Sequence, residues 1–311
     1  MLSQDPIFLA INGCCNILSC GNLARGLCLA AFDRLDCKLV GLQVPARKNC
    51  RINNHWDKQM LGIIGGSGLY SLESVGQVKR KRVKTAYDER TVPAEIIVHE
   101  GGQFVFLPRH GKNHQIAPHE INYRANIAAL HKLGVSQIVA VNAVGGITEN
   151  TRPGAIIVPD QLIDYTWGRA STYAEGEGVE VSHIDFTHPF DEALSQRLLN
   201  AVESANTTAS QRRVVLAQAV YGVTQGPRLE TAAEIKRMQQ DGCDIVGMTA
   251  MPEAALAREL GVDYAMLALS VNWAAGVLPG VISMEEIQAV MRDGQSFLHG
   301  VLLRLIKEGA R

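Results

Sequence analysis

Short runs of apolar, β-branched residues alternate with helical patterns along most of this sequence, and few architectures accommodate such an order. The runs are nearly unbroken in Val, Ile, Leu and Ala, which is typical of strands covered by helices on both faces. The predicted strands are LGIIGG (61–66), EIIVHE (95–100), QFVFLP (103–108), QIVAVNAVGG (137–146), AIIVPDQLI (155–163), VVLAQAVYGVT (214–224), DIVGMT (244–249) and DYAMLALSVNW (263–273). The predicted helices are NYRANIAALHKLG (122–134), TAAEIKRMQQDG (231–242) and PEAALARELG (252–261). We therefore expect an α/β fold, layered and of a single domain, with a mixed central β-sheet flanked by helices.

Glycines mark where these helices end. Gly134, Gly242 and Gly261 each follow a polar or basic turn, as helix stops commonly do. A last helix is predicted after Ser283, because SMEE supplies a hydroxyl cap and an acidic first turn. The sequence shows no internal repeat and no long linker beyond Met60. Residues 60–311 are therefore predicted to form one domain.

Residues 1–59 differ in character from the rest. The cysteines concentrate there, at Cys14, Cys15, Cys20, Cys28, Cys37 and Cys50, with only Cys243 beyond. Their spacing contains no paired CxxC units, which disfavours zinc, and the odd total gives no simple disulfide framework. The start MLSQDP lacks the positive region of a signal peptide. We interpret the segment as an atypical Cys-rich leader outside the catalytic fold, with a small regulatory or targeting extension as the alternative.

Charge and composition exclude several classes of partner. The formal net charge is −1, which gives no general attraction to nucleic acid or acidic lipid. The dense basic run KRKRVK (79–84) is interpreted as a solvated face flanking a strand. No apolar run has the length that spans a bilayer. We predict no nucleic-acid partner, no membrane partner and, with the thiols reduced, a cytoplasmic location.

The loop IIGGSGL (63–69) leaves a buried strand and has two explanations. Its glycines let the backbone present N–H groups to an anion, and Ser67 adds a hydroxyl. A tight turn that needs positive φ explains the same residues equally well. The spacing is neither GxGxxG nor GxxxxGKS, so a dinucleotide or nucleoside triphosphate site is disfavoured.

The stretch LPRHGKNHQIAPH (107–119) suggests either a metal site or an anion site. A helix would bring His110 and His114 together as in a zinc-binding HxxxH, but Gly111 and Pro118 argue against a helix. Arg109 ends a predicted strand, where α/β sheets place their ligands. A guanidinium with an adjacent imidazole donor matches a tetrahedral oxyanion, so we predict an anion site without metal. His119 and His131 are interpreted as surface residues.

Three further strand ends carry candidate site residues. Asn142 and Ala143 precede a glycine pair. The glycines are needed either for a turn or for a close approach of the backbone to a ligand. Met248 and Thr249 lie directly before a helix; Met is usually core filling, and its position is what singles it out. Asn272 and Trp273 end the last strand, where an amide could pair with a base edge through a donor and an acceptor. A strand-terminal turn is the alternative there.

Taken in order, these segments resemble the trimeric purine nucleoside phosphorylases and, within them, the methylthioadenosine phosphorylase branch. The resemblance covers about residues 60–290 and excludes residues 1–59. The motifs that carry it are IIGGSGL, PRHGKNH, NYRANIAAL, PGAIIVPDQLID, TQGPRLET and GMTAMPEAALARELG. It implies a nucleoside phosphorylase-like fold and a homotrimer with sites near the subunit interfaces. It also implies reversible phosphorolysis of a purine nucleoside, with inorganic phosphate as co-substrate and no metal or organic cofactor.

The resemblance also assigns roles. Around phosphate it places Ser67, Arg109, His110, Asn142, Ala143 and Thr249. It places Met248 at the ribose and His114 near the sugar, while Asn142 stands where adenosine-type members have threonine. The phosphate anion would stabilise an oxocarbenium-like sugar, and Asn272 would meet the leaving base at N7. Asn272, Arg109 and His110 are thus the predicted catalytic residues.

Substrate preference is predicted from VNWA, residues 271–274. Adenosine-type members have aspartates in a pattern like TDYD, where this chain has Asn272 and Ala274 beside Trp273. An amide donates well to O6 or N7 of a 6-oxopurine and serves an exocyclic amine less well. An unpaired buried polar group costs about 1–3 kcal/mol. The preference for 6-oxopurine over adenine nucleosides should therefore rise by about tenfold or more.

The expected substrate is accordingly S-methyl-5′-thioinosine, since the overall resemblance to the methylthio branch favours an apolar 5′ group. Three alternatives stay open: an inosine and guanosine phosphorylase, a methylthioadenosine phosphorylase, and a non-catalytic nucleoside- or phosphate-binding module.

Overall fold

The computed structural model describes residues 60–69, 71–100, 102–176 and 178–309. The predicted leader, residues 1–59, lies outside the described residues, as do the six cysteines in it. Cys243 is a free, buried cysteine.

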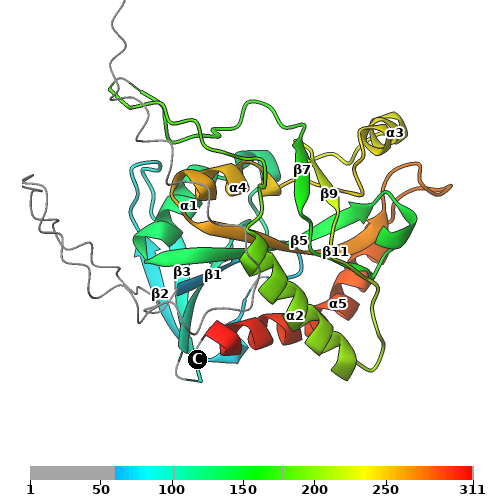
Figure 1. Ribbon diagram of the computed structural model, residues 1–311, viewed down its shortest axis with the longest axis horizontal. Helices are drawn as coiled ribbons and strands as arrows, with labels where there is room; N and C mark the ends of the chain where they lie inside the picture. The colour runs from blue at the N-terminus through cyan, green and yellow to red at the C-terminus, as the bar shows by residue number, and fades with distance from the viewer. Residues whose placement is uncertain (1–59, 70, 101, 177, 310–311) are drawn as a thin grey trace, which may run out of the picture. The chain divides into compact units, whose positions relative to one another are not determined.

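The central element is a mixed sheet of eleven strands (Figure 1). Four strands form its parallel centre: β1 (Met60–Gly65) pairs with β4 (Gly102–Pro108) and with β5 (Val135–Gly146), and β5 pairs with β11 (Asp263–Trp273). The other strands are β2 (Gln77–Val83), β3 (Val92–His99), β6 (Ile156–Ile157), β7 (Gln161–Asp164), β8 (Val215–Leu216), β9 (Val220–Val223) and β10 (Ile245–Gly247). Antiparallel pairs include β2 with β3, β3 with β4, and β10 with β5. The predicted mixed sheet is confirmed.

Helices cover both faces of this sheet. Successive side chains of β5 and β11 enter two different buried clusters, because side chains alternate across a strand. One cluster contains α1 (Tyr123–Lys132) and α4 (Ala250–Glu259), and the other contains α2 (Glu192–Thr208) and α5 (Met284–Gly309). Figure 1 shows these two helix pairs on opposite sides of the sheet. The remaining helices are α3 (Ala232–Gln240) and the 3₁₀ turns η1 (Glu73–Val75), η2 (Pro118–Glu120) and η3 (Glu149–Thr151).

The predicted helix ends are confirmed. Gly134, Gly242 and Gly261 have φ of +86°, +93° and +66°, a region that favours glycine, and they follow α1, α3 and α4. The Ser283 hydroxyl accepts from the Glu286 N–H at 3.4 Å, and α5 begins at the next residue, Met284.

The predicted strands 155–163 and 214–224 each form two short strands, β6 with β7 and β8 with β9, and two further elements differ from the expectation. Most of the basic run KRKRVK belongs to a strand, since residues 79–83 lie in β2. This strand pairs along its whole length with β3 and ends the sheet's strand order. Charged side chains suit an edge strand because they discourage pairing with another chain. The second element is α2, which was not predicted, although Leu194, Leu198, Ala201, Val202 and Ala205 form its buried stripe at helical spacing.

None of the helices in the described residues is long and apolar enough to cross a membrane.

Candidate active site

Strand ends at one edge of the sheet enclose a cavity of about 560 Å³. Because β1, β4, β5 and β11 run parallel, their carboxyl ends meet at that edge, and the first turns of α5 complete the wall. All the predicted site residues except Trp273 line it: Ser67, Arg109, His110, His114, Asn142, Ala143, Met248, Thr249, Asn272 and Ala274.

Trp273 is the exception, since it is not among the residues that line this cavity, and its predicted contact with the substrate stays a prediction. Trp273 lines a second hollow with Pro153 and Leu278, and its neighbours Asn272 and Ala274 line both hollows.

The glycine loop makes the tight turn, and its predicted binding of an anion stays a prediction. Gly68 has a φ of +86°, which meets the requirement of a tight turn. A β-carbon on Gly66 would lie 2.4 Å from the Val141 carbonyl oxygen and 2.8 Å from Nη1 of Arg109, so only glycine permits this close approach. Ser67, between them, lines the cavity. The loop is thus both a turn and a wall beside the guanidinium.

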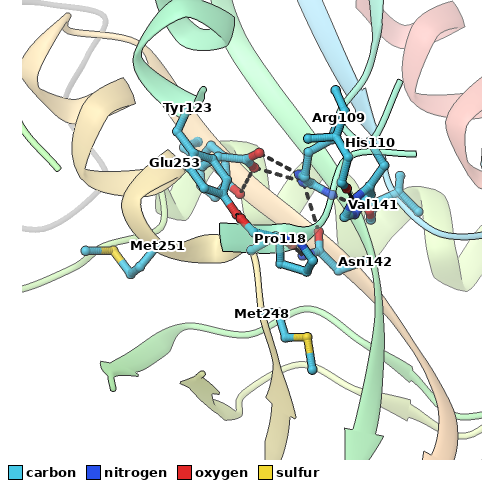
Figure 2. Close-up of polar contacts among 12 residues, drawn as sticks. Arg109, His110, Pro118, Tyr123, Val141, Asn142, Met248, Met251 and Glu253 are labelled. Atoms are coloured by element: carbon cyan, nitrogen blue, oxygen red, sulfur yellow. Dashed lines mark hydrogen bonds and ion pairs between the residues drawn. The ribbon is translucent and has the colours of Figure 1, made fainter. Parts of the chain in front are cut away.

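Arg109 is buried, with 1% of its surface exposed, and it forms a bidentate ion pair with the fully buried Glu253 of α4. Nε lies 2.5 Å from Oε1 and Nη2 lies 2.8 Å from Oε2. Figure 2 marks the contacts between the two side chains with dashed lines. The Tyr264 hydroxyl also donates to Glu253 Oε2, at 2.9 Å. The remaining bonds of the guanidinium are longer, at 3.3 Å to the Val141 carbonyl and 3.4 Å to Asn142 Oδ1. These outer N–H groups are the ones an anion in the cavity can take over.

This ion pair decides the charge of the site. Burial opposes the charge on Arg109, but Glu253 outweighs burial and raises the pKa of the guanidinium above its usual value. Burial and the Glu253 charge raise the pKa of Tyr264 well above its usual value, so its hydroxyl stays protonated. The cation expected for a bound anion is therefore already neutralised by a carboxylate of the chain.

Glu253 was not predicted as a site residue; in the sequence it stands out only as an acidic residue in the first turn of a helix. A signal was present, because PEAALA is otherwise apolar and its residues are all buried in α4. A carboxylate in such a helix must have a cationic partner. The sequence does not show which arginine that partner is.

Asn142 connects Arg109 to Thr249. Its Oδ1 accepts from Arg109 Nη2, and its Nδ2 donates to Thr249 Oγ1 at 2.7 Å. Because that oxygen accepts from the amide, the Thr249 proton is left to donate to another acceptor. Thr249 precedes α4 without capping it through its side chain, so its hydroxyl is available to a ligand in the cavity.

His110 is oriented by the loop that it begins. Its Nδ1 lies 2.8 Å from the Ile116 carbonyl oxygen, which can only accept, so Nδ1 carries the hydrogen. Burial and the neighbouring Arg109 charge lower the pKa of His110 to about 4. The ring is therefore neutral near neutral pH, and Nε2 has a lone pair. Nδ1 thus donates to the loop, and the predicted donation from this imidazole to an anion stays a prediction.

His110 and His114 lie on a turn and not on the helix that a zinc-binding HxxxH requires. The His110 and His114 rings are tilted against each other, with centroids 4.4 Å apart, on a non-helical loop in which Gly111 and His114 have positive φ. Within the described ranges, no three His, Cys, Asp or Glu side chains are grouped so that they could hold a metal ion. His119 and His131 are exposed, as expected.

The buried neutral His110 predicts a pH dependence of stability. Its folded pKa of about 4 lies below the ordinary 6.5, so between these values the unfolded chain binds a proton that the folded protein excludes. The free energy of unfolding is then largest above pH 6.5. It falls as the pH drops towards about 4, and this group accounts for about 3 kcal/mol of the fall. Urea unfolding across this interval should show a shallower slope for His110→Gln than for the unchanged protein. Equal slopes would contradict the neutral buried ring.

Glu230 is a second residue that was not predicted. It lines the cavity beside Leu229 and Pro227, and its Oε1 accepts from the Thr224 hydroxyl at 2.6 Å. Because Oε1 accepts only one hydrogen bond there, the carboxylate can accept others from a ligand. The only sequence signal was its position within the family motif TQGPRLET.

Apolar side chains of α5 form another part of the wall. Met284, Ile287 and Met291 line the cavity at helical spacing, with Gln288 as the one amide among them. The cavity thus combines a polar group of residues around Arg109, the pair Asn272 and Glu230, and an apolar face from α5.

Comparison with known proteins gives the following relatives. Residues 60–307 match the family described as the phosphorylase superfamily. A probable S-methyl-5′-thioinosine phosphorylase of Xylella fastidiosa is 47% identical over 249 residues, which cover 80% of this chain and 98% of the relative. The 6-oxopurine nucleoside phosphorylase of Pyrococcus furiosus is 39% identical, covering 79% of this chain and 91% of the relative.

Among solved structures, methylthioadenosine phosphorylase from Schistosoma mansoni in complex with adenine superposes with a TM-score of 0.73 at 31% identity. The superposition covers 80% of this chain and 91% of that one.

Proposed function

This chain belongs to the phosphorylase superfamily, and from that premise we propose that it cleaves S-methyl-5′-thioinosine with inorganic phosphate. The products are hypoxanthine and 5-methylthioribose 1-phosphate. Membership confirms the resemblance inferred from the sequence motifs, and the protein is accordingly a pentosyltransferase of the purine nucleoside phosphorylase type.

The proposed reaction is a substitution at C1′. An oxygen of hydrogen phosphate forms a bond to C1′ while the bond from C1′ to N9 breaks, and the bonding electrons leave with the purine. The purine gains one proton, which balances the one that hydrogen phosphate loses. The polar residues around Arg109 support phosphate binding, since outer guanidinium N–H groups and the Thr249 hydroxyl can donate to one anion. A held anion then stabilises the oxocarbenium-like sugar.

The observation that carries the choice of base is the presence of Asn272 and Glu230 in one cavity. A 6-oxopurine has an N1–H donor, which a carboxylate accepts, and O6 and N7 acceptors, to which an amide donates. Adenine has no hydrogen at N1, so the Glu230 carboxylate would face a lone pair. Both side chains therefore favour hypoxanthine over adenine.

The apolar face from Met284, Ile287 and Met291 supports a 5′-methylthio group. A methylthio group buries apolar surface there, at about 25 cal/mol for each Å² removed from water. Gln288 gives a specific reason for a second candidate, an inosine and guanosine phosphorylase, because its amide could bind a 5′-hydroxyl.

The remaining proposals rest on the family alone. We propose a homotrimer that acts in purine salvage in the cytoplasm, with phosphate as co-substrate and without a metal or organic cofactor.

A substrate panel tests the proposed function. Methylthioinosine, inosine, guanosine and methylthioadenosine are each incubated with and without phosphate, and the released base is followed. We expect kcat/KM for methylthioinosine to exceed that for methylthioadenosine by about tenfold or more, with no release when phosphate is omitted. Equal constants for methylthioinosine and inosine would favour the second candidate. No phosphate-dependent release from any of the four would favour a binding module.

A further inference from the structure

Arg169 lies behind the wall of the cavity, since it is not one of the described residues that line it. Its guanidinium contacts two segments that do carry lining residues. Nη2 donates to the carbonyl oxygens of Thr224 and Gln225 at 3.2 and 2.8 Å. Nη1 donates to the carbonyl oxygens of Met248 and Met251 at 2.8 and 2.6 Å. One side chain thus joins the chain that follows β9 to the chain that connects β10 with α4.

The first segment, residues 224–230, supplies the base side of the cavity. Glu230 lines the cavity, and its carboxylate accepts at 2.6 Å from the hydroxyl of Thr224, the residue whose carbonyl Arg169 holds. Arg169 also holds the Gln225 side chain, because Nε donates to its Oε1 at 3.1 Å. The position of the Glu230 carboxylate therefore depends on a backbone that Arg169 fixes.

The second segment, residues 248–251, supplies the sugar and phosphate side. Met248 and Thr249 both line the cavity. The two segments pack directly against each other, since a β-carbon on Gly226 would lie 2.5 Å from the Met248 sulfur. A displacement of one segment would therefore be transmitted to the other.

The contacts of Arg169 suit a geometric role. The oxygens that accept from it belong to carbonyls, to an amide and to the Tyr123 hydroxyl, which lies 3.2 Å from Nη1, and none of these acceptors is a carboxylate. The ring of the buried Tyr123 lies under the guanidinium, 5.3 Å from it. A guanidinium presents its N–H groups in a rigid planar fork, so these hydrogen bonds fix directions as well as distances.

We propose that Arg169 is a positioning residue of the active site: it holds the two segments so that Glu230 meets the base while Met248 and Thr249 meet the sugar and the phosphate. This inference rests on the proposed function and adds a residue that acts on the reaction only through others. Reacting groups need support from a fixed surrounding shell, and a misplacement of about 1 Å costs about a hundredfold in rate.

Arg169→Met tests the proposal in the full-length protein, because it keeps an apolar stem and removes every donor. We expect the KM values for methylthioinosine and for phosphate each to rise about tenfold or more. The ratio of kcat/KM for methylthioinosine to kcat/KM for methylthioadenosine should fall about tenfold, since Glu230 no longer stands at N1. A loss of folded protein alone lowers kcat for both nucleosides by one factor. If both KM values and the ratio stay within about twofold of the unchanged protein, the proposal is overturned.

Two further variants locate the effect. Arg304 is a matched control, because it is also half-buried and donates to the hydroxyls of Ser204 and Thr208 away from the cavity lining, so Arg304→Met should keep the KM values and the ratio. Arg169→Lys keeps the charge without the planar fork, and we expect changes in the same direction of about threefold or more. This variant decides the question if Arg169→Met does not fold, and unchanged values in it overturn the proposal. Absence of phosphate-dependent base release from the unchanged protein instead overturns the proposed function itself.

Discussion

Replacing Arg109 with methionine is expected to abolish phosphorolysis and to destabilise the fold at the same time. Activity should fall by at least about a thousandfold, since the variant loses the donors that hold the anion against the developing charge. The free energy of unfolding should fall by about 3–5 kcal/mol, because the fully buried Glu253 loses the bidentate partner at 2.5 and 2.8 Å. Base release and urea unfolding measure the two effects.

A double variant separates them. Arg109→Met with Glu253→Met removes both charges, and replacing a buried ion pair by apolar residues is often neutral or stabilising. Stability should therefore return to within about 2 kcal/mol of the unchanged protein, while phosphorolysis stays lost. If the double variant is as unstable as Arg109→Met, loss of the ion pair between Arg109 and Glu253 is not the cause of the destabilisation.

The exposed pair between Arg228 and Glu234 is the matched control. Their atoms lie 2.8 Å apart with side chains 68% and 40% exposed, so Arg228→Met should leave urea unfolding almost unchanged.

The second large effect is expected from Asn272→Asp, which should move preference from methylthioinosine towards methylthioadenosine. The ratio of the two kcat/KM values should change by about 10- to 100-fold. The Asn272 amide donates to the Trp273 carbonyl at 2.7 Å, so a carboxylate oxygen in its place would meet another acceptor. The aspartate must therefore turn away or hold a proton, and a protonated carboxyl can donate to N7 of adenine.

Kinetics on both nucleosides, with the released bases quantified, measure this change. Asn272→Ala is the control, since it removes the amide without supplying a carboxyl and should slow both substrates without exchanging their order. Adding Ala274→Asp should extend the shift, because Ala274 lines the same cavity. If the ratio does not change in Asn272→Asp, the amide does not discriminate between the bases.

Much of the fold was predictable because it depends on local patterns. The apolar runs became the parallel centre of the sheet, and Gly134, Gly242 and Gly261 ended helices at positive φ. The edge strand β2 was not predicted, because its charged sequence QVKRKRV gives no apolar alternation. Its identity as a strand depends on pairing with β3, which is a contact between segments.

The site divides in the same way. The sequence by itself determined which residues stand at the strand ends, and ten predicted residues, from Ser67 to Ala274, line one cavity because the parallel strands end at a common edge. Only the tertiary structure decided what those residues present to a ligand. Glu253, 144 positions from Arg109, neutralises the guanidinium, and the Ile116 carbonyl holds a hydrogen of His110 on Nδ1. The charge of a site side chain and the direction of its hydrogen bonds depend on the partners that folding brings within about 3 Å. The order of residues in the sequence does not show which partners those are.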